Sequence, residues 1–270
     1  MLHARFRSLL PGILASACLW SALPSGAQSF RSVFKSGYDG WIPDFADYAA
    51  ADSAKRELRY EIGEIPSISP AMTALRMTGV PAYPRAPDST DDLFPFIRKR
   101  FTGLAPNTEY GITFKAEFAT ALGQFNQDTL WIKAAATVIE PRKTASSDGT
   151  YRMNIAKGLP RRPGADMDTL GSIGYTGGGH RFPEVLTLGN PNHPIRSRTD
   201  GTGAVWISLG AEYIPSAGTD GTEFNIGTLQ VDFTPLATSL RPHAKSGTVS
   251  GRRVFDSRHR ARNLLGVHMP

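Results

Sequence analysis

The chain has 270 residues, 30 Lys and Arg against 24 Asp and Glu, and a single cysteine, Cys18. Residues 1–27 hold two of the basic residues, and residues 237–270 hold seven basic residues and one acidic residue, which leaves 21 basic and 23 acidic residues in 28–236. The central part is therefore not basic, and nucleic acid is not an expected partner. Because Cys18 lies near the start, disulfides and thiolate metal sites are not expected to stabilise residues 28–236.

The first 27 residues have the organisation of a secretory signal peptide. Arg5 and Arg7 precede an apolar run from Leu9 to Leu23, and the small residues Ser25-Gly26-Ala27 follow. We expect cleavage after Ala27 and a secreted or periplasmic protein. The run is shorter than the roughly 20 residues of a membrane-spanning helix, and no later segment is long and apolar enough, so no transmembrane segment is expected. Ala15-Ser16-Ala17-Cys18 is similar to a lipoprotein box, which leaves a lipid-anchored form as the less favoured alternative.

Residues 28–236 are predicted to form one domain, long enough to bury about 70% of the surface of the unfolded chain. In chain order, the only helix-like segment is Ala46–Glu57. Period-two alternation of apolar and polar side chains, or a short apolar run, then predicts strands. These lie at Arg59–Ile62, Ala71–Met77, Phe94–Phe101, Tyr110–Phe118, Leu130–Ile132, Tyr151–Ile155, Val205–Leu209 and Phe224–Phe233. Residues 237–270 are predicted to be a basic, disordered tail, because they contain few apolar side chains.

The last of these strands changes phase. Phe224 and Ile226 share one parity, whereas Leu229, Val231 and Phe233 share the other. One extra residue near Gly227 would produce this change, so a β-bulge is expected there. With 27 Gly and 20 Pro between short strands, the pattern predicts an all-β fold: an antiparallel β-sandwich of the jelly-roll type or a related Greek key.

The segment before the strand at Tyr110 contains a short motif. The spacing Leu104-x-Pro106-x-Thr108-x-Tyr110 resembles the tyrosine corner of fibronectin type III and other β-sandwich domains. The resemblance covers eight residues and implies that the Tyr110 hydroxyl forms a hydrogen bond with the loop that precedes it. The β-rich pattern continues for more than a hundred residues, which is longer than one fibronectin module.

Five other segments are similar to segments of uncharacterised exported bacterial proteins and lipoproteins. They are Asp39-Gly40-Trp41, Asp44-Phe45-Ala46-Asp47-Tyr48, Asp91-Asp92-Leu93-Phe94, Trp131-Ile132-Lys133-Ala134 and Asn154-Ile155-Ala156-Lys157-Gly158. The similarity spans about residues 38–234 and implies export, but it implies no particular activity.

Catalytic motifs are largely missing from the sequence. There is no Gly-x-Ser-x-Gly elbow, no His-Glu-x-x-His, no phosphate loop and no dinucleotide fingerprint. His180 and His193 are the histidines of the central part, and a solvated loop is the favoured location for His180. Glu117 and Glu184 are one possible glycosidase pair, with no more support than any two carboxylates. We therefore leave enzymatic activity open and favour a protein that is not an enzyme.

Acidic residues near the predicted ends of the sandwich suggest a calcium site. Asp39, Asp44 and Asp47 lie in the N-terminal stretch, Asp91-Asp92 precede a strand, and Asp232 lies on the last strand. Hard oxygen ligands suit calcium, and we take Asp39, Asp44 and Asp232 as the candidate ligands. The alternative is that these residues only satisfy backbone groups at turns and strand ends.

Three tryptophans suggest carbohydrate binding, because exposed aromatic rings stack on sugar faces. Trp41, Trp131 and Trp206 are the candidate platforms, and Trp206 is preferred since it opposes the aliphatic side chains of Val205, Ile207 and Leu209. Burial of these rings in the sandwich is the competing interpretation.

Two other functions remain open beside glycan binding. One is a structural or adhesive envelope protein without a small ligand. The other is a polysaccharide lyase or hydrolase: Leu130–Ala134 resembles a strand of jelly-roll alginate lyases, although the Gln-x-His and Arg-rich motifs of that family are missing. The sequence does not indicate an oligomeric state.

Overall fold

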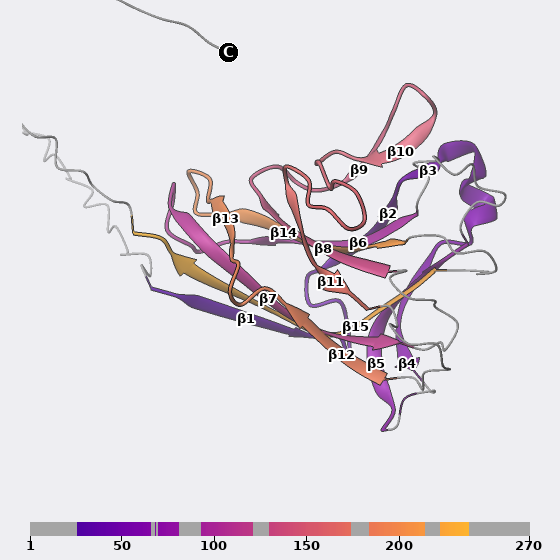
Figure 1. The fold of residues 1–270 in the computed structure, drawn as a ribbon, viewed down its shortest axis with the longest axis horizontal. Helices are drawn as coiled ribbons and strands as arrows, with labels where there is room; N and C mark the ends of the chain where they lie inside the picture. Colours follow the sequence, from indigo (N-terminus) through magenta and orange to yellow (C-terminus); the bar gives the residue numbers. More distant parts are fainter. Residues whose placement is uncertain are drawn as a thin grey trace, which may run out of the picture. The chain divides into compact units, whose positions relative to one another are not determined.

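The computed structural model describes residues 26–65, 68, 70–80, 93–120, 130–173, 184–213 and 222–237 (Figure 1). Nearly all of the predicted signal peptide and tail lie outside these residues, as do His180, Asp91 and Asp92. Among the residues that the structure describes, no helix has the length and apolar character needed to cross a membrane.

Within the described residues, the strands form three antiparallel sheets. The first sheet has the order β12 (Glu184–Gly189), β7 (Glu109–Thr120), β15 (Thr222–Pro235), β5 (Met72–Gly79) and β4 (Arg59–Ile65), with β1 (Gln28–Val33) beside β15 and β13 (Ile195–Arg198) beside β7. The second sheet has the order β11 (Met167–Ser172), β8 (Leu130–Thr137), β14 (Val205–Tyr213), β6 (Phe94–Phe101) and β2 (Ile42–Ala46). A small third sheet contains β3 (Tyr48–Ala49), β10 (Thr150–Met153) and β9 (Lys143–Ala145).

The first and second sheets pack face to face around one hydrophobic core. Alternate side chains of β7 and β15 from the first sheet, and of β8 and β14 from the second, belong to this core. Aromatic rings join the sheets at one end, where the ring of Phe101 on β6 lies 5.0 Å from that of Phe30 on β1 and 5.3 Å from that of Phe233 on β15. The predicted all-β antiparallel sandwich is thereby confirmed.

Two local predictions are also confirmed. The pairing of β15 with β7 shifts register between Ile226 and Thr228, which places the bulge at Gly227. The backbone N–H of Ala105 donates a hydrogen bond to the hydroxyl oxygen of Tyr110 at 3.0 Å, as a tyrosine corner requires.

The predicted helix Ala46–Glu57 is wrong over its first part. Ala46 ends β2, and Tyr48–Ala49 form β3, which pairs with β10. Only the 3₁₀ helix η1 (Ala50–Arg56) is helical, and it ends at Glu57 with a φ of 46°. Tertiary pairing with β10 outweighs the weak helical propensity of the segment. The predicted strand Tyr151–Ile155 is also shorter than expected, since β10 ends at Met153.

One end of the second sheet carries an additional layer. On its outer face, which points away from the first sheet, a smaller apolar cluster contains Ala46, Phe94, Phe96, Ala135, Ile155 and Met167, with the half-buried Met153 packed against it. The segment that connects β10 to β11, residues 154–166, supplies Ile155 to this cluster, and we call this segment the covering loop.

Candidate functional site

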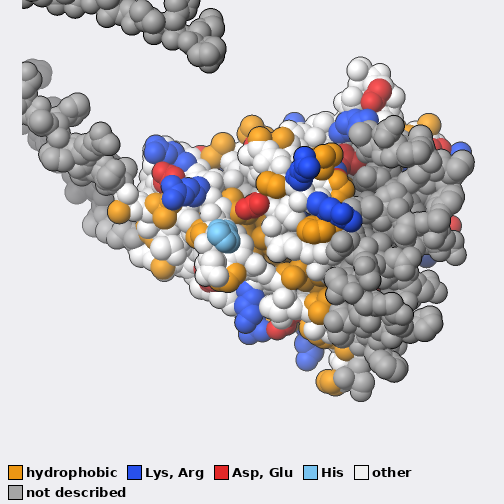
Figure 2. All heavy atoms as spheres, viewed as in Figure 1, with side chains coloured by type: hydrophobic (Ala, Val, Ile, Leu, Met, Phe, Trp, Pro, Cys, Tyr) orange, Lys and Arg blue, Asp and Glu red, His pale blue; other side chains and the backbone are white. Residues whose placement is uncertain are grey.

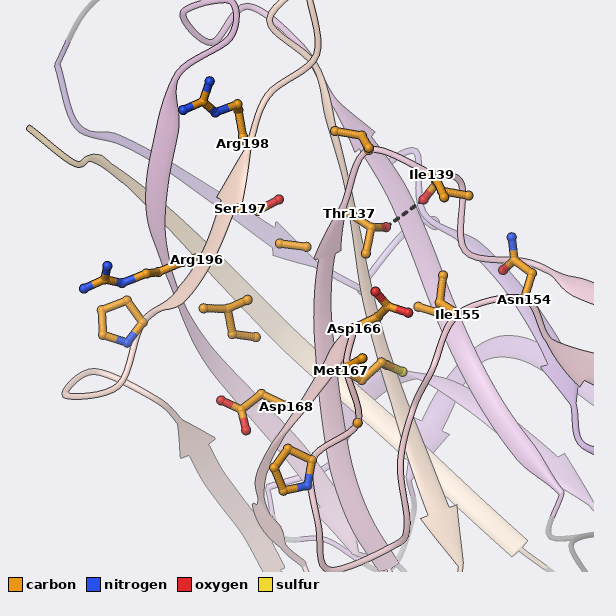
Figure 3. Close-up of a pocket in the computed structure, with 17 residues that line it drawn as sticks. Thr137, Ile139, Asn154, Ile155, Asp166, Met167, Asp168, Arg196, Ser197 and Arg198 are labelled. Atoms are coloured by element: carbon orange, nitrogen blue, oxygen red, sulfur yellow. Dashed lines mark hydrogen bonds between the residues drawn. The ribbon is translucent and has the colours of Figure 1, made fainter. Parts of the chain in front are cut away.

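A groove of about 680 Å³ lies between β13 of the first sheet and the β8–β11 edge of the second sheet (Figure 3). Three segments line it: the end of β8 with the residues that follow, the covering loop with the start of β11, and β13. The lining residues are Ala136, Thr137, Val138, Ile139, Asn154, Ile155, Pro163, Gly164, Ala165, Asp166, Met167, Asp168, Pro194, Ile195, Arg196, Ser197 and Arg198.

The groove combines exposed apolar side chains with acidic and hydroxyl groups. Val138 and Ile139 are 55% and 62% exposed, which is unusual for large aliphatic side chains. Asp166 and Asp168 each use one carboxylate oxygen to accept a hydrogen bond from a backbone N–H. The second oxygen of each carboxylate is thus available for another hydrogen bond.

Successive side chains of β13 point to opposite sides of the strand. Figure 3 shows that the hydroxyl of Ser197 points toward Thr137 of β8, whereas the side chains of Arg196 and Arg198 point away from β8. Consecutive residues of a strand face opposite sides, so the two guanidinium groups lie at the rim and the hydroxyl faces the interior. Around this site, Figure 2 shows hydrophobic, basic, acidic and uncharged side chains mixed on one face, without a large surface of one sign.

Buried polar residues fix β13 in place. The side chain of Asn190 accepts a hydrogen bond from the N–H of Phe114 at 2.6 Å and donates to the carbonyl of His193 at 3.0 Å. At the other end, the Thr199 hydroxyl donates to the carbonyl of Ala105 at 2.6 Å. One wall of the groove is therefore held at both ends by side-chain bonds to β7 or to the loop before it.

The opposite wall, the covering loop, is held by a lysine of β8. The ammonium of Lys133 donates hydrogen bonds to the carbonyl oxygens of Lys157, Leu159 and Arg162, at 2.7, 2.5 and 2.8 Å. The Lys133 side chain is fully buried. Three donors of a lysine ammonium are thus used on three carbonyls of one loop, which closes around the cation.

Two glycines allow the covering loop to close this tightly. A Cβ atom at Gly164 would lie 2.1 Å from the carbonyl oxygen of Ala156, and one at Gly158 would lie 2.4 Å from the amide nitrogen of Gly164. Gly158 also has a φ of 77°, a conformation that disfavours side chains. The base of the loop is closed by the Asp166 carboxylate, which accepts a hydrogen bond from the N–H of Ala156 at 2.7 Å.

Further charges surround Lys133. A carboxylate oxygen of Glu212 lies 3.6 Å from the Lys133 ammonium, and its other oxygen bonds to the Lys157 ammonium. The Lys157 ammonium also lies 3.1 Å from the Asp47 carboxylate. These four residues, Asp47, Lys133, Lys157 and Glu212, form a charge cluster. Burial lowers the pKa of Lys133 and raises that of Glu212. Burial alone would lower the pKa of Lys157 too, but the carboxylates of Asp47 and Glu212 outweigh it, so that pKa is raised.

This four-residue charge cluster is closed to solvent rather than open to a substrate. Asp47, Lys133 and Glu212 are all buried, and the Lys133 ammonium already has three carbonyl partners. A lysine nucleophile needs a free amine that can reach its substrate. We therefore assign the cluster a structural role.

Trp206 lies on the outer face of the second sheet, as its parity predicts. Val205, Ile207 and Leu209 are buried in the core, whereas Trp206 is partly exposed. Its cross-strand neighbours are Thr137 of β8 and Arg100 of β6. Because directly opposite residues of adjacent strands contact one another, Trp206 is next to Thr137, which lines the groove. Ser208, the other residue of this parity, is buried and donates a hydrogen bond to the carbonyl of Ile97 at 3.0 Å.

The other two candidate tryptophans have different environments. Trp41 is only 3% exposed, and its indole N–H donates a hydrogen bond to Ser32 at 2.9 Å. Trp131 is half-buried, and the guanidinium of Arg161 from the covering loop lies 6.0 Å from the centre of its ring. The structure does not bring the three tryptophans together: Trp41 belongs to the core, and Trp131 and Trp206 lie toward opposite ends of β8.

The three candidate calcium ligands each contact other side chains. Asp39 accepts a hydrogen bond from Ser32 at 2.5 Å and lies 3.5 Å from the Lys99 ammonium. Asp44 lies 3.1 Å from Lys143 and 3.5 Å from Arg98, and Asp232 accepts a hydrogen bond from Gln230 at 3.0 Å. Among the described residues, no three His, Cys, Asp or Glu side chains are grouped as a metal site.

The suggested carboxylate pair falls on two neighbouring strands. Glu117 of β7 accepts a hydrogen bond from Thr228 at 2.8 Å, and Glu184 of β12 is paired in register with Thr120. Paired positions of adjacent strands share a face of the sheet, so position 184 shares the face of position 120. Positions 117 and 120 of β7 differ by an odd number and face opposite sides, so Glu117 and position 184 belong to opposite faces of the sheet. His193 is an exposed residue of the turn before β13.

Comparisons with known proteins identify no family. No family model and no curated protein matches the sequence. Among solved structures, the chain is similar to the K1 cleaved adhesin domain of Lys-gingipain from Porphyromonas gingivalis W83, with 8% identity, a TM-score of 0.35, and 78% of this chain and 99% of that chain covered. A CBM4 structure has 14% identity and a TM-score of 0.26, with 73% and 86% covered.

A third similar structure is the enzymatically active domain of bacteriophage CBA120 tailspike protein 4, with 10% identity and a TM-score of 0.22. The similarity covers 78% of this chain but only 20% of that chain. At these identities and TM-scores, no residue role is transferred from the three structures. The class of protein is defined by the fold itself, an all-β antiparallel sandwich with a groove at one edge.

Proposed function

We propose that this protein binds glycan chains through the surface that runs from Trp206 across Thr137 into the groove beside β13. The observation that carries the proposal is the position of Trp206, a partly exposed indole directly opposite a groove-lining residue on the adjacent strand. A flat aromatic ring supplies apolar contact area at a small cost in conformational entropy.

The groove supplies the polar part of such a site. Sugar hydroxyls need hydrogen-bond acceptors and donors of fixed direction. The second carboxylate oxygens of Asp166 and Asp168 are acceptors. The hydroxyl groups of Thr137 and Ser197 lie on facing strands; that of Thr137 donates to the carbonyl of Ile139 at 2.6 Å and so offers a ligand only its lone pairs. The backbone of both walls is tied to the sandwich by hydrogen bonds, so the site is largely formed before any ligand binds.

The size of the groove fits the proposal. A volume of about 680 Å³ is within the range of small-molecule sites. Export to the cell exterior, which the N-terminal sequence predicts, would place the protein where such chains occur.

An adhesive function is the second candidate, and Val138 and Ile139 favour it. These adjacent aliphatic residues are 55% and 62% exposed at the groove. Apolar side chains exposed next to each other are common at protein contacts. For an adhesive protein, substituting Val138 and Ile139 by Ser would abolish attachment to its target surface and Trp206→Ala would have the smaller effect, whereas a glycan site built on Trp206 would show the opposite order of effects.

The experiment is a glycan-array screen of the purified protein, followed by calorimetric titration of the best ligand against the wild type, Trp206→Ala and Tyr60→Ala. We expect Trp206→Ala to lower the affinity at least tenfold, which corresponds to about 1.4 kcal/mol. Tyr60→Ala removes an exposed aromatic ring of β4, in the other sheet and outside the groove lining, and is expected to bind like the wild type.

Thermal unfolding of the same variants separates the binding role from a packing role. Truncation of a fully buried tryptophan costs about 3–5 kcal/mol, and a half-buried one should cost clearly less. A Trp206→Ala protein with full affinity for the ligand would refute the proposal, as would a wild type that binds nothing on the array. Turnover of a bound polysaccharide would instead identify an enzyme.

A further inference from the structure

We propose that Lys133 is the positioning residue of the groove: its buried ammonium holds the covering loop in the one conformation that forms the groove wall. The inference deepens the proposed function and rests on it for the binding readout. Its geometric basis is the three hydrogen bonds from Lys133 to the carbonyls of Lys157, Leu159 and Arg162. The residues immediately after them, Pro163–Met167, line the groove.

Among the described residues, the backbone of the middle of the loop, residues 157–162, is bonded to the sheet through Lys133. The loop contains no helix or strand between β10 and β11. Its other backbone bonds lie at its base, from Asp166 and Met167 to the carbonyl of Ala156 and from Gly164 to that of Met167, and in one turn from Arg162 to Leu159.

Two side chains of the loop also contact the sandwich: Lys157 pairs with Asp47 and Glu212, and Arg161 lies over the ring of Trp131. Lys133 differs from these contacts because it holds the loop backbone itself, at three carbonyl oxygens.

Opening of the loop would cost more than three hydrogen bonds. The Lys133 side chain is fully buried on the outer face of the sheet, and Glu212 lies 3.6 Å from it. A buried ammonium that loses its three carbonyl partners keeps only the carboxylate of Glu212, and its desolvation is then poorly compensated. The buried charge of Lys133 therefore makes opening of the covering loop unfavourable as long as the sheet is folded.

The wall is also sensitive to small displacements. Gly158 and Gly164 are in close backbone contact, so the loop is packed against itself with little free space. A shift at residues 157–162 is transmitted to Pro163–Asp166, which follow directly. Removal of the ammonium should consequently alter the groove even if the sandwich remains folded.

The test compares the wild type with Lys133→Met and with the double variant Lys133→Met/Glu212→Gln, which also removes the facing carboxylate. Removing both charges avoids leaving one buried and unpaired, so the double variant is expected to fold. Lys143→Met is the matched control, because Lys143 also lies at an ion-pair distance from a carboxylate, 3.1 Å from Asp44, and its ammonium lies at the rings of Tyr48 and Tyr151 instead of at the carbonyls of the covering loop.

The first readout is limited proteolysis with trypsin, followed by mass spectrometry of cleavage after Arg161. We expect cleavage at this bond to be at least tenfold faster in both Lys133 variants than in the wild type and in Lys143→Met. Protection equal to that of the wild type in the folded double variant would overturn the inference. This readout does not require any ligand, so it tests whether Lys133 holds the covering loop even if the protein binds no glycan.

The second readout is affinity for the best glycan of the array. We expect at least a tenfold loss in the Lys133 variants and no change in Lys143→Met. Chemical rescue tests the charge itself: Lys133→Cys in a Cys18→Ala background, aminoethylated at the thiol while unfolded and then refolded, regains an ammonium at this position. Restored loop protection and affinity would support the inference, whereas a loop that is released without any loss of affinity would overturn it.

Discussion

The hydroxyl oxygen of Tyr110 accepts a hydrogen bond from the backbone N–H of Ala105, five residues earlier, at 3.0 Å. The Tyr110 ring is buried, and its centre lies 6.1 Å from that of Phe233. The residue thus joins the loop before β7 to the core between the two sheets. Thr199, at the end of β13, bonds to the carbonyl of the same Ala105.

Tyr110→Phe is expected to destabilise the fold without changing its core. The substitution keeps the ring and leaves the part-buried Ala105 N–H without its partner, which should cost about 1 kcal/mol, the value of a typical hydrogen bond. Urea unfolding measures the change. Tyr60→Phe, at a ring that is 47% exposed, should be within about 0.5 kcal/mol of the wild type; equal stability of the two variants would contradict the tyrosine corner.

The turn before β14 offers a matched pair of glycines. Gly203 has a φ of 75°, and a Cβ atom there would lie 2.0 Å from the carbonyl oxygen of Leu104. We expect Gly203→Ala to cost about 2 kcal/mol or more, from backbone strain and the clash. At Gly201, a Cβ atom would have no neighbour within 4 Å, so Gly201→Ala should leave the melting temperature nearly unchanged. The prediction fails if both substitutions have the same effect.

Asp200 should contribute to the loss of stability in acid. Its carboxylate accepts hydrogen bonds from the Thr202 hydroxyl at 2.6 Å and from the N–H groups of Thr202 and Ala204. These bonds hold the pKa of Asp200 below its ordinary value of 3.8, and the bond from the Thr202 hydroxyl has the largest effect. The unfolded state therefore binds more protons in acid, and this stabilisation is present above the ordinary pKa and lost as the pH falls below it.

The corresponding measurement is the melting temperature from pH 6 to pH 2 for the wild type and Asp200→Asn. We expect a smaller decrease in the variant, because an amide does not titrate. An equal or steeper decrease would show that Asp200 does not contribute to the pH dependence.

Calcium has its own test, since Asp39, Asp44 and Asp232 remain untested as ligands. Asp39 and Asp44 lie close to basic side chains, which already balance their charge. We expect an unchanged melting curve when a chelator is added and no increase with excess calcium. A ligand that binds only the native state raises its stability by mass action, so a calcium-dependent shift would support the calcium hypothesis.

The elements predicted best are the strands with one face in the core and the other exposed. In β7, β14 and β15, alternation alone identifies the buried face, and the change of parity at Gly227 locates the bulge. The strands that were missed have weaker patterns. For example, β13 has four residues, and β11 contains Gly171 and an irregular register with β8.

The site was predicted only in part. Parity places Trp206 on the face away from the main core, but no parity applies to Trp41, which precedes β2 and is buried. The groove was not predicted, because its walls come from three segments that are distant in sequence. The role of Lys133 is not predictable from the sequence either, because a lysine at an outward position of a strand usually contacts water. Nothing in the sequence indicates that a loop 24 to 29 residues further along the chain covers it.

The position of Lys133 also bears on the local dynamics of the protein. Irregular loops usually exchange their amide hydrogens quickly through small fluctuations that leave the rest of the fold intact. Here the covering loop surrounds the Lys133 ammonium, which is buried from water. Any fluctuation that frees the carbonyls of Lys157, Leu159 and Arg162 must therefore also hydrate this ammonium. The amides at the base of this loop should therefore exchange at rates close to those of the β8 and β14 amides, as part of the same cooperative unit, although the loop has no regular secondary structure.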